Sequence, residues 1–87
     1  MKWTVVWVSA AEQELAELWM RPGTARAVSA AAHAIDKTLS QNPEEAGESR
    51  GPGQRILLEP PLGVTFEVLA NDRMARVLDV WIPSQRG

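Results

Sequence analysis

The chain has 87 residues, a length typical of one small domain, of which 45% are hydrophobic and 23% charged, a balance that excludes a disordered protein. It contains no cysteine, which excludes disulfides and thiolate chemistry, and its formal net charge of −2 disfavours nucleic acid as the main partner. No apolar stretch is long enough to span a membrane and the N-terminal residues do not resemble a signal peptide, so a cytoplasmic location is expected.

The N-terminal stretch, residues 1–8, is predicted to form a strand. Its sequence KWTVVWV is rich in β-branched and aromatic residues. Both faces of this strand are mostly apolar, which favours a central position in the sheet or cover on both sides. The tryptophans Trp3 and Trp7 are accordingly expected in the core, as is Trp19 on the helix that follows.

Residues 9–42 are predicted to form two helices that pack together as an antiparallel hairpin. Ser9 and Glu12 have the spacing of a capping box, so the first helix should start just after Ser9. Thr24 is expected to cap the second helix with its side chain. His33 falls outside the apolar stripe of that helix and is expected at the surface. The stripe consists of Val28, Ala31, Ala32, Ile35 and Leu39.

The rest of the chain is predicted to form a loop, three strands and a short tail. Residues 43–54 are polar and rich in glycine and proline, as expected for a loop. Residues 55–82 contain three strand-like segments, separated by a Pro-Pro and an Asn-Asp dipeptide, which predicts an antiparallel meander. Residues 83–87 resemble a frayed tail. The expected order is β-α-α-β-β-β, an α+β fold in which a helical hairpin covers one face of a small, mainly antiparallel sheet.

This order, at this length, resembles the RelE/ParE toxins of bacterial toxin–antitoxin pairs. The opening KWTVVWVSAAEQELAEL is similar to the start of those toxins, where a strand runs into a capped helix. The stretch ESRGPGQRILLEPPLGVTFEVLANDRMARVLDVW is similar to their second half, where a glycine-containing loop leads to an arginine-bearing strand. The resemblance covers nearly all of residues 1–87 and implies one domain, a growth-inhibiting toxin that a cognate antitoxin protein neutralises. No cofactor and no metal site are expected.

The family acts on two kinds of target. RelE-like members cut messenger RNA on the ribosome, using basic residues of the sheet and a tyrosine or histidine near the C-terminus, whereas ParE-like members inhibit DNA gyrase. Cleavage of RNA needs groups that move protons and a group that stabilises the phosphorane. This chain has no tyrosine, and its only histidine, His33, lies on the predicted second helix. A ParE-like toxin that acts by binding is therefore favoured, while a ribosome-dependent endoribonuclease and a non-toxic interaction module remain alternatives.

Arginines and one tryptophan are the candidate site residues. The last strand is expected to alternate, with Val80 on one face and Val77 and Trp81 on the other, so Trp81 should project from the face that the helices leave open. Arg50 also has a plainer interpretation as a partner of Glu48. The candidates for catalysis are Arg50, Arg55, Arg76 and Arg86. The candidates for protein binding are Trp81, Arg73 and Arg55.

Two surfaces are expected to receive an antitoxin. An antitoxin tail could add a strand to an open edge of the sheet, or lay an amphipathic helix across the helical hairpin. The first helix carries the acidic residues Glu12, Glu14 and Glu17, which would suit a basic partner segment.

Overall fold

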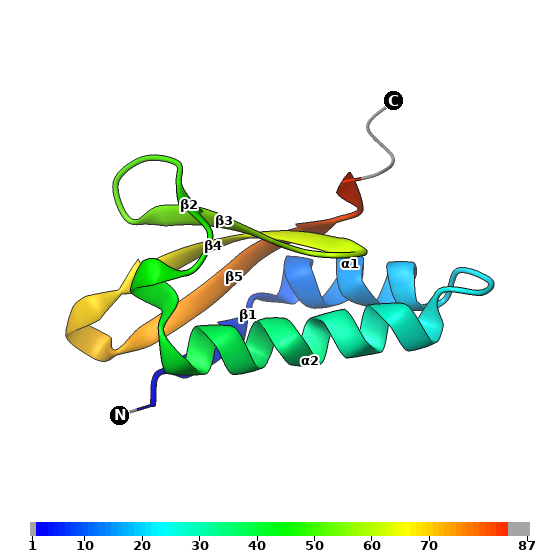
Figure 1. The fold of residues 1–87 in the computed structure, drawn as a ribbon, viewed down its shortest axis with the longest axis horizontal. Helices are drawn as coiled ribbons and strands as arrows, with labels where there is room; N and C mark the ends of the chain where they lie inside the picture. Colours follow the sequence, from blue (N-terminus) through cyan, green and yellow to red (C-terminus); the bar gives the residue numbers. More distant parts are fainter. Residues whose placement is uncertain (1, 84–87) are drawn as a thin grey trace.

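The computed structural model describes residues 2–83 as a twisted sheet with two helices on one face (Figure 1). The helices are α1 (Ser9–Trp19) and α2 (Ala25–Gln41). The strands are β1 (Thr4–Trp7), β2 (Glu48–Ser49), β3 (Gln54–Glu59), β4 (Leu62–Leu69) and β5 (Met74–Trp81). Two 3₁₀ helices, η1 (Pro43–Glu45) and η2 (Ala70–Asp72), precede β2 and β5. Within residues 2–83, no helix is long and apolar enough to cross a membrane.

The strands form one five-stranded sheet in the order β1-β5-β4-β3-β2. β1 runs parallel to β5, and every other neighbouring pair is antiparallel. The first and last strands therefore lie side by side, with Thr4 opposite Met74. The predicted α+β fold, a helical hairpin on one face of a mainly antiparallel sheet, is confirmed.

β1 lies at an edge of the sheet, so the central position predicted for it is wrong. It is also shorter than the predicted strand over residues 1–8. Val5 and Trp7 face the helices and pack against the core, which accounts for one of its apolar faces. Val6 lies on the other face and is only half-buried. An apolar strand can thus be an edge strand when only one of its sides is covered.

Both helices begin without the side-chain caps that the sequence predicts. Val8, not Ser9, holds the N-cap position of α1, and no side-chain hydrogen bond caps that end. Thr24 precedes α2, but its hydroxyl donates to the carbonyl oxygens of Leu18 (3.1 Å) and Arg21 (3.0 Å). Thr24 therefore ties the end of α1 to the turn instead of capping α2.

Residues 43–54 are more ordered than the predicted loop, since they contain η1 and the short strand β2. Arg55 of β3 holds this region, because its Nε donates to the Ala46 carbonyl at 2.7 Å and its Nη2 to the Gly47 carbonyl at 3.1 Å. Gly47 has a φ of +64°, and a Cβ there would overlap the carbonyl oxygen of Ile56. Glycine is thus required for the chain to turn back against β3.

A β-bulge in β5 changes the alternation expected for the last strand. Thr65 pairs with Asp79 while Phe66 pairs with Val77, so Leu78 has no direct partner on β4. As a result Val77 and Val80 both face the helices and are buried, and the prediction that they lie on opposite faces is wrong. The turn before β5 also differs from a simple Asn-Asp hairpin, because η2 fills it.

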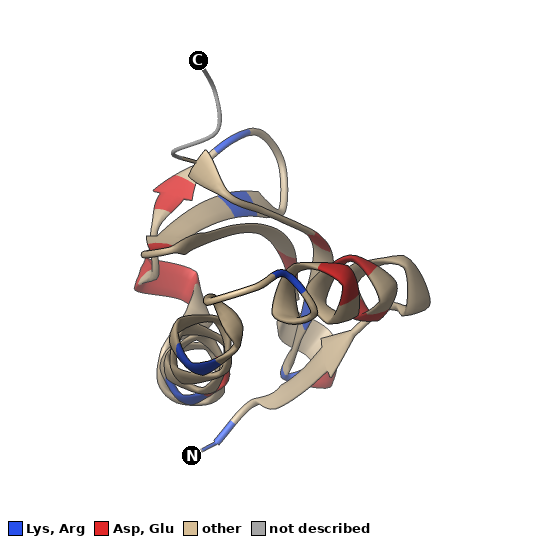
Figure 2. Cartoon of the chain, turned by 90° about the vertical axis from the view of Figure 1, so that its right-hand side faces the viewer, with Lys and Arg blue, Asp and Glu red and all other residues tan. Residues whose placement is uncertain are grey.

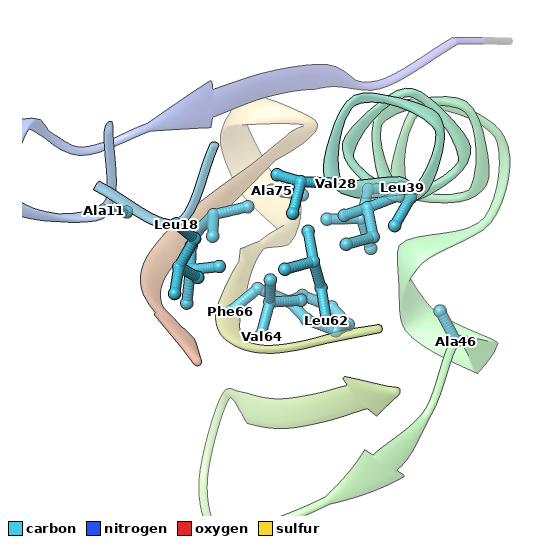
Figure 3. Close-up of a cluster of buried hydrophobic side chains, with 13 residues drawn as sticks. Ala11, Leu18, Val28, Leu39, Ala46, Leu62, Val64, Phe66 and Ala75 are labelled. Carbon is cyan, nitrogen blue, oxygen red and sulfur yellow. The ribbon is translucent and has the colours of Figure 1, made fainter. Parts of the chain in front are cut away.

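The core lies between the sheet and the helices (Figure 3). Its largest side chain, Phe66, comes from the central strand β4 and is fully buried. The apolar stripe predicted on α2 is confirmed, and Ala32 is its only half-buried member. The peptide bond between Pro60 and Pro61, in the β3–β4 turn, is cis. Residues 84–87 of the predicted tail lie outside the described residues.

Two glycines allow a matched test of the turn before β2. Gly23 has a φ of +78°, and a Cβ there would have open space around it, so Gly23→Ala adds only left-handed strain, about 1–3 kcal/mol. Gly47→Ala adds the same strain plus the overlap with Ile56, and we expect a larger loss in the free energy of unfolding. Urea unfolding of both variants measures the difference, and equal losses would show that the close approach at Gly47 does not matter.

Candidate functional site

The face of the sheet that the helices leave uncovered is the first candidate surface. Residues on a strand alternate between its two faces, and directly paired residues share a face. Positions flanking the buried Val64 and Phe66 on β4 therefore face away from the helices. The centre of this open face consists of Ile56, Leu58, Gly63, Thr65, Glu67, Arg76, Asp79 and Trp81.

Trp81 lies on the open face, where it covers Gly63. A Cβ at Gly63 would lie 2.9 Å from the indole of Trp81 and 3.0 Å from the side chain of Leu58. The missing side chain thus makes room for the ring, and Trp81 is half-buried. Leu58 is 58% exposed on the neighbouring strand. We call Leu58, Gly63 and Trp81 the apolar patch; it offers an aromatic anchor to a protein partner.

Two of the predicted arginines form ion pairs with nearby carboxylates. Arg76, on the open face, pairs with Glu67 of β4. Arg50, in the turn between β2 and β3, has its Nη2 3.7 Å from Oε1 of Glu48, and both side chains are mostly exposed. The plainer interpretation of Arg50, as the partner of Glu48, therefore describes its position.

The other predicted arginines lie elsewhere. Arg55 is on the helix-facing side of β3, where backbone carbonyls hold its guanidinium. Arg73 follows η2 with a φ of +48°, and its guanidinium carbon lies 4.8 Å from the centre of the Trp3 ring. Arg86 lies outside the described residues. The candidates for catalysis within residues 2–83 are thus spread over both faces of the sheet and do not converge.

Within residues 2–83, the open face does not carry a cluster of basic residues. Figure 2 shows the Lys and Arg positions spread over different elements. On the strands of the open face, Arg76 is accompanied by the acidic residues Glu48, Glu67 and Asp79. Binding to nucleic acid depends on clustered positive charge. Among the residues that the structure describes, no group of three or more His, Asp or Glu is placed to hold a metal ion.

A groove between α1 and α2 is the second candidate surface, and the sequence did not indicate it as a cavity. It has a volume of about 560 Å³ and is open to solvent. Its polar rim includes Glu12 and Asp36, and the exposed His33 also lines it. Its apolar lining consists of Leu15, Ala16, Trp19, Val28 and Ala32.

Two tryptophans line or adjoin this groove, held by hydrogen bonds to α2. Trp19 donates from its Nε1 to Oγ of Ser29 at 2.8 Å, and Trp7 from its Nε1 to Oδ1 of Asp36 at 2.7 Å. Trp19 is 50% exposed and Trp3 is half-buried outside the core, so the prediction that these two lie in the core is wrong, whereas the half-buried Trp7 packs against the core as predicted. An indole N–H needs a polar partner, and both partners stand at the surface of α2.

Neither models of protein families nor curated proteins match this sequence. Solved structures do resemble it. A chain in the crystal structure of the toxin–antitoxin complex RelBE2 from Mycobacterium tuberculosis has a TM-score of 0.79 and 16% identity, over 98% of this chain and 95% of that chain.

Two further solved structures agree. A chain of the chromosomal ParDE toxin–antitoxin system from P. aeruginosa has a TM-score of 0.68 and 24% identity, over 92% of this chain and 95% of that chain. The isolated E. coli RelE toxin has a TM-score of 0.67 and 16% identity, over 92% of this chain and 83% of that chain. The fold implied by the sequence resemblance is therefore confirmed: this chain has the fold of RelE and ParE toxins.

The packing of the Trp81 ring over Gly63 can be tested by adding a side chain at Gly63. Alanine in a strand interior ordinarily stabilises relative to glycine by roughly 0.5–1 kcal/mol. Gly63→Ala should instead destabilise by about 1–3 kcal/mol, because the added methyl group meets the indole. It should also shift the Trp81 indole N–H resonance in NMR spectra, assigned with Trp81→Phe. Thr65→Ala, on the same face, is the control; an unshifted Trp81 resonance in folded Gly63→Ala would contradict the arrangement.

Proposed function

We propose that this protein is the toxin of a type II toxin–antitoxin pair and acts by binding a protein target, as ParE-like toxins do. Its fold, shared with chains from two toxin–antitoxin systems and with an isolated toxin, supports the class. Binding is favoured over catalysis because two of the predicted catalytic arginines already have partners within the protein. Backbone carbonyls bind the guanidinium of Arg55, and a carboxylate pairs with Arg76. DNA gyrase is the target to test first.

The apolar patch is the part of the open face best suited to the target. Leu58 offers a largely exposed aliphatic side chain beside the half-buried Trp81. Aromatic residues that are partly fixed before binding lose little conformational freedom on forming a contact. The Trp81 ring lies over the backbone of Gly63, and the Leu58 side chain reaches the same glycine, so Trp81 is preorganised in this sense.

The groove between α1 and α2 is the proposed seat of the antitoxin. An apolar channel between two helices fits the apolar face of an amphipathic helix. Glu12 and Glu17 are exposed on α1, so a segment with basic residues flanking its apolar face would complement the charge. Glu14 is less available, because its carboxylate accepts a hydrogen bond from the Val80 backbone.

Ribosome-dependent cleavage of messenger RNA is the second candidate function. The supporting observation is that Arg76 and Glu67 lie together on the open face: with a substrate between them, the carboxylate would accept a proton and the guanidinium would stabilise the phosphorane. No histidine lies on that face to protonate the leaving oxygen, since His33 is on α2. A non-toxic interaction module is the third candidate, and induced expression separates it, because a harmless protein would support the module.

Target binding is tested by placing a charge in the apolar patch. Leu58→Asp should abolish growth arrest on induced expression and inhibition of gyrase supercoiling by purified protein, because it puts a carboxylate in the proposed contact. Met20→Asp is the matched control, since Met20 is 76% exposed at the end of α1, and it should stay active. Cleavage of messenger RNA in an in vitro translation assay, lost on Arg76→Ala, would replace binding with the nuclease.

Antitoxin binding is tested by blocking the groove. Ala16 lines it, so Ala16→Arg should leave growth arrest intact but prevent rescue by a co-expressed antitoxin, to be sought as the product of an adjacent open reading frame. Gln13→Arg adds the same side chain to an exposed position of α1 outside the groove and should still be rescued. Co-purification of each variant with that neighbouring protein gives the same comparison in vitro. Rescue of both variants would remove the groove as the antitoxin site.

A further inference from the structure

The sheet has three stretches of edge that no strand covers: β1, the part of β5 beyond β1, and the opposite side formed by β2 and β3. The last two are protected. Beyond the end of β1, the edge of β5 is covered by α1, where Oε1 of Glu14 accepts the Val80 N–H at 3.1 Å. At the opposite side of the sheet, the edge strand β2 has only two residues, and β3 runs into Pro60 and Pro61. Short strands, prolines and inward charges are the features by which proteins prevent strands from pairing at their edges.

The edge of β1 is covered by α2 at its start, where the Trp3 N–H donates to the Ser40 carbonyl at 2.7 Å, and it is open beyond that contact. Thr4 donates its N–H to the Arg73 carbonyl at 2.9 Å and Val8 donates to the Val77 carbonyl at 3.0 Å, so the even-numbered residues turn their backbone groups toward β5. Those of Val5 and Trp7 point outward. Apart from the pairing of β1 with β5, no backbone hydrogen bond to Val5 or Trp7 is found within residues 2–83.

The composition of this edge makes it a pairing surface. The run from Trp3 to Val8 contains no charge and no proline, and it consists of residues that favour strands. Unpaired backbone groups on such a strand form a template for another strand. A strand added here would satisfy two donors and two acceptors, those of Val5 and Trp7.

We propose that a second copy of this chain occupies the edge, with the two β1 strands antiparallel about a twofold axis at Val6. This register places Val5 opposite the partner's Trp7, and the reverse, so that the four outward groups of each copy meet complementary groups. It also pairs a β-branched with an aromatic residue twice on the helix-facing side, a favourable cross-strand combination. The interface is self-complementary, as a twofold dimer requires.

The surface beside the edge supports a second copy. A groove of about 510 Å³ between β1 and α2 continues the edge toward the helix, and Val5, Asp36 and Lys37 line it. Asp36 and Lys37 are adjacent and of opposite charge, so their charges cancel. When a twofold axis brings the two grooves together, no excess of positive or negative charge opposes the contact. The strands alone are short for a stable dimer, which buries roughly 1,200–2,000 Å² in total, and this groove supplies further contact area.

The proposed dimer is independent of the function proposed above. Leu58 lies on β3, which two strands, β4 and β5, separate from β1. The apolar patch therefore stays open when the β1 edge is covered. Toxicity and dimerisation can fail separately.

Hydrogen exchange of the purified full chain tests the pairing at individual residues. In a dimer, the Val5 and Trp7 amides should be protected, and their protection should fall when the protein is diluted. The Thr4 and Val8 amides bond to β5 within one chain and should be protected at every concentration, which makes them internal controls. Free exchange of Val5 and Trp7 at all concentrations, with Thr4 and Val8 protected, would overturn the proposal.

A pair of lysine variants tests the twofold axis. Val6→Lys places two ammonium groups directly opposite each other across the axis, so it should abolish the dimer that sedimentation velocity is expected to show for the natural sequence. Thr4→Lys adds the same charge to the same face of β1, two residues from the axis, and should remain dimeric. A monomeric natural sequence overturns the proposal. So does protection of Val5 and Trp7 only on co-expression with the neighbouring protein, which would assign the edge to that protein's strand.

Discussion

The parallel pairing of β1 with β5 is the contact on which the rest of this structure depends. It joins the two ends of the described chain, with Thr4 opposite Met74 and Trp7 opposite Val77. Because β1 is fixed there, Trp7 can reach across to Asp36 and hold α2 against the sheet. Because β1 ends at Trp7, no strand pairs with the part of β5 that follows. There the carboxylate of Glu14 on α1 accepts the Val80 N–H in place of a strand.

The same pairing explains why local sequence signals predicted the elements better than their boundaries. The order of elements follows from Pro, Gly and apolar periodicity, which are local. The start of α1 does not, because Val8 still donates to Val77 in the sheet and is therefore extended when the helix begins. Ser9 is thus inside the helix and cannot cap it. The bulge at Leu78, which buries both Val77 and Val80, likewise depends on pairing with a separate strand.

The candidate site was harder to predict, because several side chains that look functional in the sequence instead make contacts that stabilise the fold. Arg55 holds the backbone before β2, and Arg73 lies over Trp3. Their partners are 8 to 70 residues away along the chain, so no spacing rule identifies them. Trp19 shows the reverse case, since its bond to Ser29 keeps an apolar side chain at the surface. The alternation of side chains along the last strand predicted that Trp81 lies on the open face, and the structure agrees. The bulge does not change this result, because it precedes Val80 and the alternation from Val80 to Trp81 is regular.

The arrangement of the three surfaces constrains how neutralisation would work. The helical groove and the apolar patch are on opposite sides of the sheet, so a helix bound in the groove cannot by itself cover Leu58 or Trp81. An antitoxin that blocks the patch directly must therefore extend around an edge of the sheet. With the β1 edge occupied by a second copy, the route past β2 and β3 remains, and it leads to Leu58 first, because β3 is the strand next to β2. Antitoxin and dimer would then use different edges of one sheet.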